Sequence, residues 1–151
     1  MPSPRISPSR PLWVRLPQAV FAAAGLIFAT CTIVAEIEYA KGAFGDGRTR
    51  DERLQYIKSA VRWYPPNHEF RNAVSYFHFM NRQKGSLPEA VEAHVVALES
   101  NPYAFDVRRN LASLYYEAGK KELAMEQIGI IKSRSPNANI VLIVNKNPSN
   151  N

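Results

Sequence analysis

His78 and His94 are the first residues to test for chemistry, because two imidazoles that face each other can hold a metal ion or move a proton. We expect them on the two helices of one helical hairpin, where their side chains could approach. A zinc site needs three or four protein ligands, and no cysteine or carboxylate stands at a fixed spacing from either histidine. We predict that both histidines pack or hydrogen-bond, with no metal and no cofactor.

The sequence offers no other catalytic pattern. It lacks a phosphate-binding loop, a metal-binding motif and a nucleophile elbow. Its single cysteine, Cys31, lies in an apolar run and cannot form a disulfide or a cysteine-based zinc site within one chain. His68 follows Pro65-Pro66-Asn67 and reads as an exposed turn residue. We predict that the protein is not an enzyme.

The way in which the net charge of +6 is distributed along the chain argues against nucleic acid as a partner. Residues 1–18 contain three arginines and no acidic residue, which accounts for half of the excess. Acidic and basic residues are mixed along the rest of the chain. A nucleic-acid surface is typically a basic stripe with stacking aromatic residues, and no such stripe is visible.

A long apolar segment near the N-terminus predicts a transmembrane helix over residues 12–41. Twenty residues from Leu16 to Ala35 carry no charge, and twenty helical residues span about 30 Å, the hydrocarbon thickness of a bilayer. Pro17 suits the first turn of this helix. Trp13 and Tyr39 stand where aromatic residues mark the two membrane interfaces.

The flanking charges predict the orientation of this helix. Arginines precede it and Glu36 and Glu38 follow it, so the positive-inside rule places the N-terminus in the cytoplasm. The expected location is the inner membrane of a bacterium, crossed once, with the rest of the chain in the periplasm. The alternatives are a cleaved signal peptide, for which Ile33-Val34-Ala35 is a poor cleavage site, and a lipoprotein signal, for which the threonine before Cys31 is unsuitable.

Two further features belong to this N-terminal part. Ala22, Gly25 and Ala29 form a small-residue face suited to packing against another membrane helix. Residues 1–11, rich in proline and serine, are predicted to be a disordered cytoplasmic tail, and residues 42–50 are predicted to be a linker.

The second half of the chain contains an internal repeat. Three pairs of identical residues are separated by 34 positions: Gly85 and Gly119, Ala90 and Ala124, Pro102 and Pro136. Glycine suits the end of a helix, alanine suits a close helix crossing, and proline ends a helix. Apolar residues recur between them at helical spacing. In the first unit, the residues of the first helix that are expected to face the second helix are Ala73, Val74, Phe77 and Met80, and they oppose Val91, Val95 and Leu98. In the second unit, the corresponding residues are Leu111, Leu114, Tyr115 and Ala118, and they oppose Leu123, Ala124, Ile128 and Ile131.

The last unit resembles a tetratricopeptide repeat, a hairpin of two helices with this period. The characteristic residues of that family are matched at Leu111, Ala112, Tyr115, Gly119, Ala124 and Pro136. The preceding unit departs from the pattern at His78 and Asn81. Residues 54–65 resemble a second helix with its closing proline, whose first helix is missing or supplied by the end of the membrane helix. The resemblance implies an all-α fold: one N-terminal transmembrane helix and a short tetratricopeptide-like solenoid of two to three hairpins over residues 51–136.

The resemblance also implies a binding surface, because the first helices of such hairpins line a concave groove for partner peptides. The groove residues expected here are Asn72, Ser75, Phe79, Arg82, Asp106, Arg109, Ser113 and Tyr116. The arginines would suit an acidic segment, and Phe79 and Tyr116 an apolar side chain. The alternative is that these residues are ordinary solvated positions of their helices.

The C-terminal stretch, residues 137–151, contains the apolar run from Ile140 to Val144. It could be a short helix over the last hairpin, a strand added to a partner, or a flexible tail, and it offers a route to a homodimer. We predict a membrane-anchored adaptor that mediates protein–protein interaction in a membrane or envelope complex. The alternatives are a structural accessory subunit held mainly through its transmembrane helix, and a periplasmic holdase-type chaperone.

Overall fold

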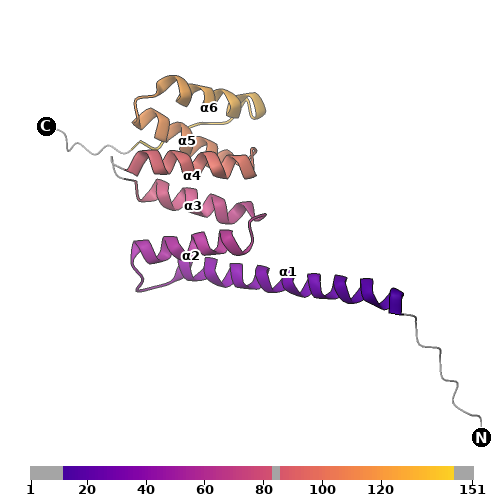
Figure 1. The fold of residues 1–151 in the computed structure, drawn as a ribbon. Helices are drawn as coiled ribbons and strands as arrows, with labels where there is room; N and C mark the ends of the chain where they lie inside the picture. Colours follow the sequence, from indigo (N-terminus) through magenta and orange to yellow (C-terminus); the bar gives the residue numbers. More distant parts are fainter. Residues whose placement is uncertain (1–11, 83–85, 145–151) are drawn as a thin grey trace, which may run out of the picture.

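The computed structural model describes residues 12–82 and 86–144, with side chains from residue 16 onward. Helices make up the described chain, and these residues form no strand (Figure 1): α1 (Leu12–Phe44), α2 (Arg50–Trp63), α3 (His68–Met80), α4 (Leu87–Ser100), α5 (Phe105–Glu117) and α6 (Lys121–Arg134). The all-α prediction and the long apolar N-terminal helix are confirmed. The predicted tail at 1–11, the helix-ending Gly85 and the last residues of the C-terminal stretch lie outside the described residues.

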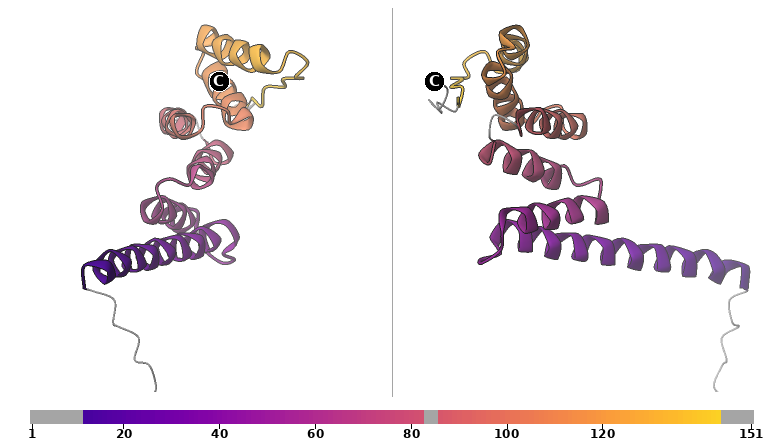
Figure 2. Two further views of the ribbon diagram at one scale, coloured as in Figure 1. Left: turned by 90° about the vertical axis from the view of Figure 1, so that its right-hand side faces the viewer. Right: turned by 60° about the vertical axis from the view of Figure 1, so that its left-hand side comes forward.

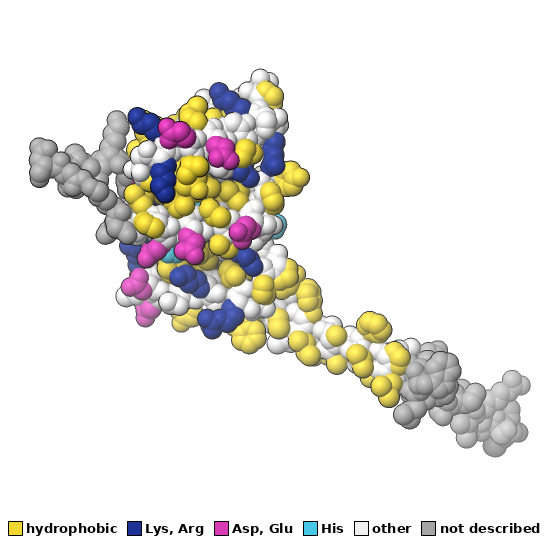
Figure 3. Space-filling view, turned by 45° about the horizontal axis from the view of Figure 1, so that its top comes forward, with side chains coloured by type: hydrophobic (Ala, Val, Ile, Leu, Met, Phe, Trp, Pro, Cys, Tyr) yellow, Lys and Arg dark blue, Asp and Glu magenta, His cyan; other side chains and the backbone are white. Residues whose placement is uncertain are grey.

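Helix α1 has two parts with different surroundings (Figures 1 and 2). Its first half projects from the stack of the other helices, and its second half packs along α2. Hydrophobic side chains cover the projecting half (Figure 3), among them Val20, Phe21 and Leu26, which are 60%, 78% and 71% exposed. The helix is long and apolar enough to cross a membrane, although a signal sequence meets the same criteria.

The boundaries of α1 differ from those expected. The helix begins before Pro17, which therefore lies inside it rather than in its first turn. It continues to Phe44, so the linker is confined to residues 45–49. Tyr39 was expected at a membrane interface, but its ring lies 5.2 Å from that of Phe70 within the folded body.

The second half of α1 supplies the helix against which α2 folds. Ala35 on α1 and Ala60 on α2 are fully buried and form a cluster with Phe70 on α3. Small residues at this crossing let the backbones of α1 and α2 approach closely. Gly42, two turns further along α1, lies at a second close approach. The chain entering α2 is fixed by Thr49 and Glu52, whose side chains each bond to the other's backbone N–H.

The three even-numbered helices end in the same turn. The residues that follow α2, α4 and α6 are Tyr64, Asn101 and Ser135, with φ near −140° and ψ of 75°, 88° and 80°. Each precedes a proline, which excludes the helical conformation for the residue before it. Each carbonyl also accepts a hydrogen bond from the N–H three residues later. This turn returns the chain for the next helix.

The turn between α5 and α6 depends on Gly119, as expected. Its φ of +74° lies in the left-handed region, where a side chain would be strained. The N–H groups of Gly119 and Lys120 bond to the carbonyls of Tyr116 and Tyr115, which satisfies the open end of α5.

The remaining core lies between successive hairpins. Phe79, Ala90 and Leu114 form one buried cluster, and a second contains Ala97, Leu98, Val107 and Leu111. The expected apolar stripes are wrong at four positions: Ala118 and Leu123 are exposed in the α5–α6 unit, and Met80 and Val95 are exposed in the α3–α4 unit. Met80 and Val95 are 60% and 37% exposed, because they lie on the sides of α3 and α4 that no other helix covers.

Gly42 provides a test of the α1–α2 packing. A Cβ at this position would lie 2.7 Å from the Arg53 carbonyl oxygen, whereas one at Gly25 would meet nothing within 4 Å. Overpacking costs about 1–3 kcal/mol, which outweighs the gain of about 1 kcal/mol when alanine replaces glycine inside a helix. We expect Gly42→Ala to lower the thermal unfolding temperature in detergent and Gly25→Ala to leave it unchanged or slightly raised. Equal effects would contradict the close approach.

Candidate partner-binding surface

The inner surface of the stack, defined as the exposed side of α3, α5 and the end of α1, contains two hollows. The α1–α3 hollow has a volume of about 580 Å³ and the α3–α5 hollow about 310 Å³. Helices α3 and α5 contact each other directly, so the two hollows are neighbours along one surface. Asn72 and Tyr76 line both of them.

The α1–α3 hollow is largely apolar and open. Phe44, Tyr76 and Met80 line it and are 77%, 56% and 60% exposed. Arg53 forms part of its wall and donates hydrogen bonds of 2.8 Å to the carbonyls of Gly42 and Ala43 at the end of α1. The guanidinium thereby satisfies the last turn of that helix.

The α3–α5 hollow is more polar. Asp106 lies at its rim, and the amide oxygens of Asn72 and Asn110 are buried without a hydrogen-bond partner among the described residues. A buried acceptor that lacks a partner costs about 1–3 kcal/mol. These two oxygens lie beneath the surface of the hollow, so a donor reaches them only if the surrounding side chains move.

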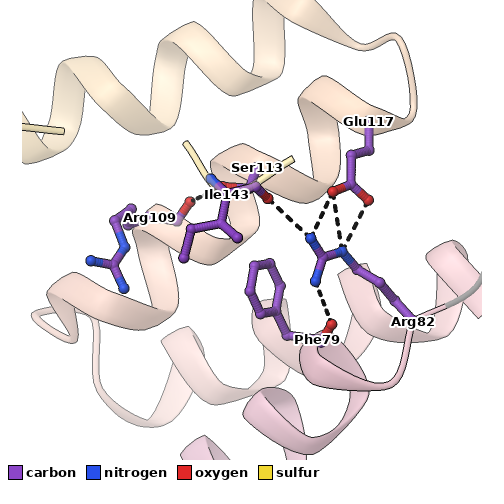
Figure 4. A network of polar contacts seen from close by, with 6 residues as sticks. All are labelled: Phe79, Arg82, Arg109, Ser113, Glu117 and Ile143. Carbon is purple, nitrogen blue, oxygen red and sulfur yellow. Dashed lines mark hydrogen bonds and ion pairs between the residues drawn. The ribbon is translucent and has the colours of Figure 1, made fainter. Parts of the chain in front are cut away.

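The C-terminal run lies against the stack as an extended segment rather than a helix. The chain turns at Ser135 and runs back toward the end of α3 (Figure 1). The Ile143 N–H donates to Ser113 Oγ at 3.0 Å, and the Ile143 carbonyl accepts from Arg82 Nη2 at 3.0 Å (Figure 4). Ala138, Ile140 and Leu142 are half-buried, while alternate residues are exposed. The segment is thus held through both its main chain and every second side chain.

Arg82 organises this contact (Figure 4). Its guanidinium pairs with Glu117 at 2.7 Å and lies over the Phe79 ring, 3.8 Å from the ring centroid. The ring of His94 meets the Phe79 ring edge-on, with the two ring centroids 5.8 Å apart. Both side chains of the ion pair are less than a tenth exposed. Arg82 therefore joins α3, α5 and the C-terminal segment.

The structure separates the eight residues expected to line a groove. Four of them are buried inside the fold: Ser75, Phe79, Arg82 and Ser113. Asn72, Ser75 and Asp106 line the α3–α5 hollow. Arg109 pairs with Asp106 at 3.2 Å, and Tyr116 is 45% exposed but lines neither hollow. Arg82 and Phe79 were expected to meet a partner, but Glu117 and the C-terminal segment already cover them.

The residues that the sequence analysis did not select are mostly those of the α1–α3 hollow. Tyr76 and Met80 stand four positions apart on α3, a spacing that places them on one helix face. That spacing is visible in the sequence, but the helical periodicity of α3 predicts a core position for Met80. Phe44 could not be identified, because the sequence did not reveal that α1 extends beside α3.

The two histidines are packing residues in this fold. His94 is fully buried, and its Nδ1 lies 2.7 Å from the Ala90 carbonyl oxygen. Burial, opposed in part by this hydrogen bond, lowers its pKa to about 4, and burial also lowers the pKa of His78. Within the described residues no group of three or more His, Cys, Asp or Glu could hold a metal ion.

The predicted packing face of the membrane helix is open. Ala22, Gly25 and Ala29 are exposed on the projecting half of α1, and nothing in the described chain approaches within 4 Å of a Cβ built at Gly25. This face remains available for another helix.

No protein-family model matches the chain, and no curated protein is significantly similar to it in sequence. The function must therefore be inferred from the side chains and surfaces of this chain.

The buried pair of Arg82 and Glu117 predicts a large effect on stability. Removing one partner of a buried ion pair costs about 3–5 kcal/mol, whereas an exposed pair contributes about 0–1 kcal/mol. We expect Arg82→Ala to reduce the free energy of unfolding by the larger amount and to speed hydrogen exchange at the Ile143 amide. Arg109→Ala, which breaks the exposed pair with Asp106, is the matched control. Similar losses in both variants would exclude this account of Arg82.

The lowered pKa of His94 predicts that stability falls as the pH falls. The unfolded chain binds a proton at a pKa near 6.5, but the folded chain binds it only near pH 4. The contribution of neutral His94 to the free energy of unfolding is complete above pH 6.5. Below that pH it decreases by about 1.4 kcal/mol per pH unit, down to about pH 4. We expect His94→Gln to flatten this slope in chemical denaturation at several pH values. His68→Gln, at the exposed first residue of α3 rather than in the turn where it was expected, should leave the slope unchanged. An unchanged slope in His94→Gln would refute the assignment.

Proposed function

We propose that this protein is a membrane-anchored, tetratricopeptide-like adaptor that holds an extended segment of a partner protein on its inner surface. In this proposal α1 crosses the inner membrane of a bacterium, the N-terminus is cytoplasmic, and the helical stack lies in the periplasm. The protein performs no chemistry itself. It keeps a partner close to the membrane.

The packing of α1 supports an anchor rather than a cleaved leader. Cleavage after Ala35 would remove Phe28, whose ring contacts that of Tyr64 at 5.4 Å, and would place a new chain end in the cluster around Phe70. A removable leader gains nothing from such contacts. A permanent anchor gains a fixed connection between the membrane and the folded body.

Several features support the tetratricopeptide-like assignment. Helices α3–α4 and α5–α6 follow the 34-residue repeat, and α1–α2 packs as a third pair. The same turn with its proline follows α2, α4 and α6. Three pairs meet the number of units that such repeats need to bury a continuous core.

The contact between Ile143 and the stack is the observation that carries the binding proposal. Ser113 and Arg82 bind the N–H and the carbonyl of one residue in an extended segment. Main-chain recognition of this kind does not depend on the side chain of the bound residue, so it can accept other sequences. The two hollows on the inner surface add an apolar site and a more polar one.

Site-specific photo-crosslinking in cells tests this proposal. A photoreactive amino acid is placed at Tyr76 or Met80 in the α1–α3 hollow, and at Met125 on α6 as a control of similar exposure, 63% against 60% for Met80. We expect Tyr76 and Met80 to crosslink to the same protein and Met125 to give no such product. A third site, Ala22, reports contacts within the membrane.

The pattern of products distinguishes the proposal from its main alternative. A structural subunit held through its membrane helix would crosslink at Ala22 and not at Tyr76 or Met80. That outcome, or equal labelling at Met125, would overturn the inner-surface proposal.

A further inference from the structure

The helical stack has one end that faces the direction in which α1 projects. Successive helices run in opposite directions, so the α2–α3 turn, the α4–α5 turn and the end of α6 lie together at this end (Figures 1 and 2). We call it the span-facing end. The linker at 45–49 and the α5–α6 turn lie at the opposite end.

The length of α1 brings the span-facing end to the membrane. The ring contact between Phe28 and Tyr64 shows how far along α1 the body reaches. From Leu16 to Phe28 the helix is only about 20 Å long, and even from Leu12 only about 25 Å, at 1.5 Å per residue. A bilayer has a hydrocarbon thickness of about 30 Å. If α1 spans the bilayer, the α2–α3 turn must lie among the lipid headgroups or closer to the hydrocarbon core.

The residues of this turn suit such a position. Trp63 is 47% exposed, and Tyr64 and two prolines follow it. Tryptophan and tyrosine concentrate at membrane interfaces, where their rings lie among the headgroups and their polar groups reach water. Tyr39, which the sequence suggested for this role, is packed inside the body, so this turn takes its place.

In the neighbouring α4–α5 turn, the Pro102 carbonyl accepts hydrogen bonds from two arginines, Arg108 on α5 and Arg134 at the end of α6. Arg108 and Arg134 donate to the Pro102 oxygen at 2.9 and 2.8 Å. Arg108 Nη1 also donates to Gln127 Oε1 at 2.7 Å, and Arg134 lies over the Tyr103 ring, 4.5 Å from its centroid. Neither arginine forms an ion pair with a described carboxylate. Guanidinium groups bind phosphate oxygens through several N–H donors at once.

We propose that the span-facing end rests on the bilayer that α1 crosses, with Trp63 and Tyr64 in the interface and Arg108 and Arg134 bound to the phosphates of acidic lipids. This inference depends on the membrane anchor of the proposed function. It adds an orientation: the stack lies against the membrane, and its inner surface opens sideways, parallel to the bilayer. A partner segment would then be held beside the headgroups.

Fluorescence quenching in lipid nanodiscs tests this orientation. The full chain carries Trp13→Phe, so that Trp63 is the remaining tryptophan, and the nanodiscs contain phosphatidylcholine brominated near the headgroup. We expect bromine to quench most of the Trp63 emission. The matched control carries Trp13→Phe, Trp63→Phe and Tyr116→Trp, which places a similarly exposed ring, 45% against 47%, at the opposite end. It should not be quenched.

A second arm tests the arginines. Phe105→Trp, in a chain with both native tryptophans replaced by phenylalanine, reports on the α4–α5 turn. We expect stronger quenching when half of the lipid is phosphatidylglycerol, and loss of that increase in Arg108→Gln/Arg134→Gln. Lys120→Gln/Lys121→Gln removes the same charge at the opposite end and should keep the increase. An acidic protein segment as the true ligand of the arginines would leave the quenching independent of phosphatidylglycerol.

A Val20→Trp chain separates the failure of this inference from failure of the anchor. Quenching at Val20 by deeply brominated lipid without quenching at Trp63 would show that α1 is inserted while the stack stands away from the bilayer. That result would overturn the orientation and leave the anchored adaptor intact. No quenching at either position would overturn both.

Discussion

The packing of the second half of α1 against α2 is the constraint on which the rest of this structure depends. Ala35 and Ala60 allow the two backbones to meet, and Phe70 brings α3 into the same cluster. Because one continuous helix both projects from the body and belongs to its core, the stack cannot rotate freely about the projecting half of α1. A flexible linker in place of this contact would leave the position of the inner surface relative to a membrane undefined.

The inner surface of the stack is partly occupied by the chain's own C-terminal segment. Arg82 is held by Glu117 and Phe79, and it in turn holds the main chain at Ile143. The C-terminal segment therefore completes the fold at the same place where a groove was expected. The α1–α3 and α3–α5 hollows are left open, and Tyr76, which lines both, is exposed. A partner would bind beside the C-terminal segment or displace it.

Patterns local in the sequence predicted the all-α fold and the long apolar N-terminal helix. Periodicity, proline and glycine positions were sufficient for the helices, and Gly119 has the positive φ that its role requires. The candidate site was harder to predict, because it depends on contacts between distant residues. Nothing near Arg82 in the sequence indicates that Glu117, 35 residues away, neutralises it. Likewise, helical periodicity could not determine that Met80 lies beyond the reach of α4, since that depends on how the two helices cross.

The most direct test of the central claim is a crosslink between α1 and the α2–α3 turn in native membranes. Phe28→Cys and Tyr64→Cys are introduced together with Cys31→Ser, and a short bifunctional thiol reagent is added. A protease site placed in residues 45–49 then separates α1 from the rest of the chain, unless the reagent has joined the two cysteines. The account predicts efficient joining for this pair and none for Phe21→Cys with Tyr64→Cys, where the label lies two helical turns further along the projecting part. Failure of Phe28→Cys and Tyr64→Cys to join, while each reacts with the reagent singly, would contradict it.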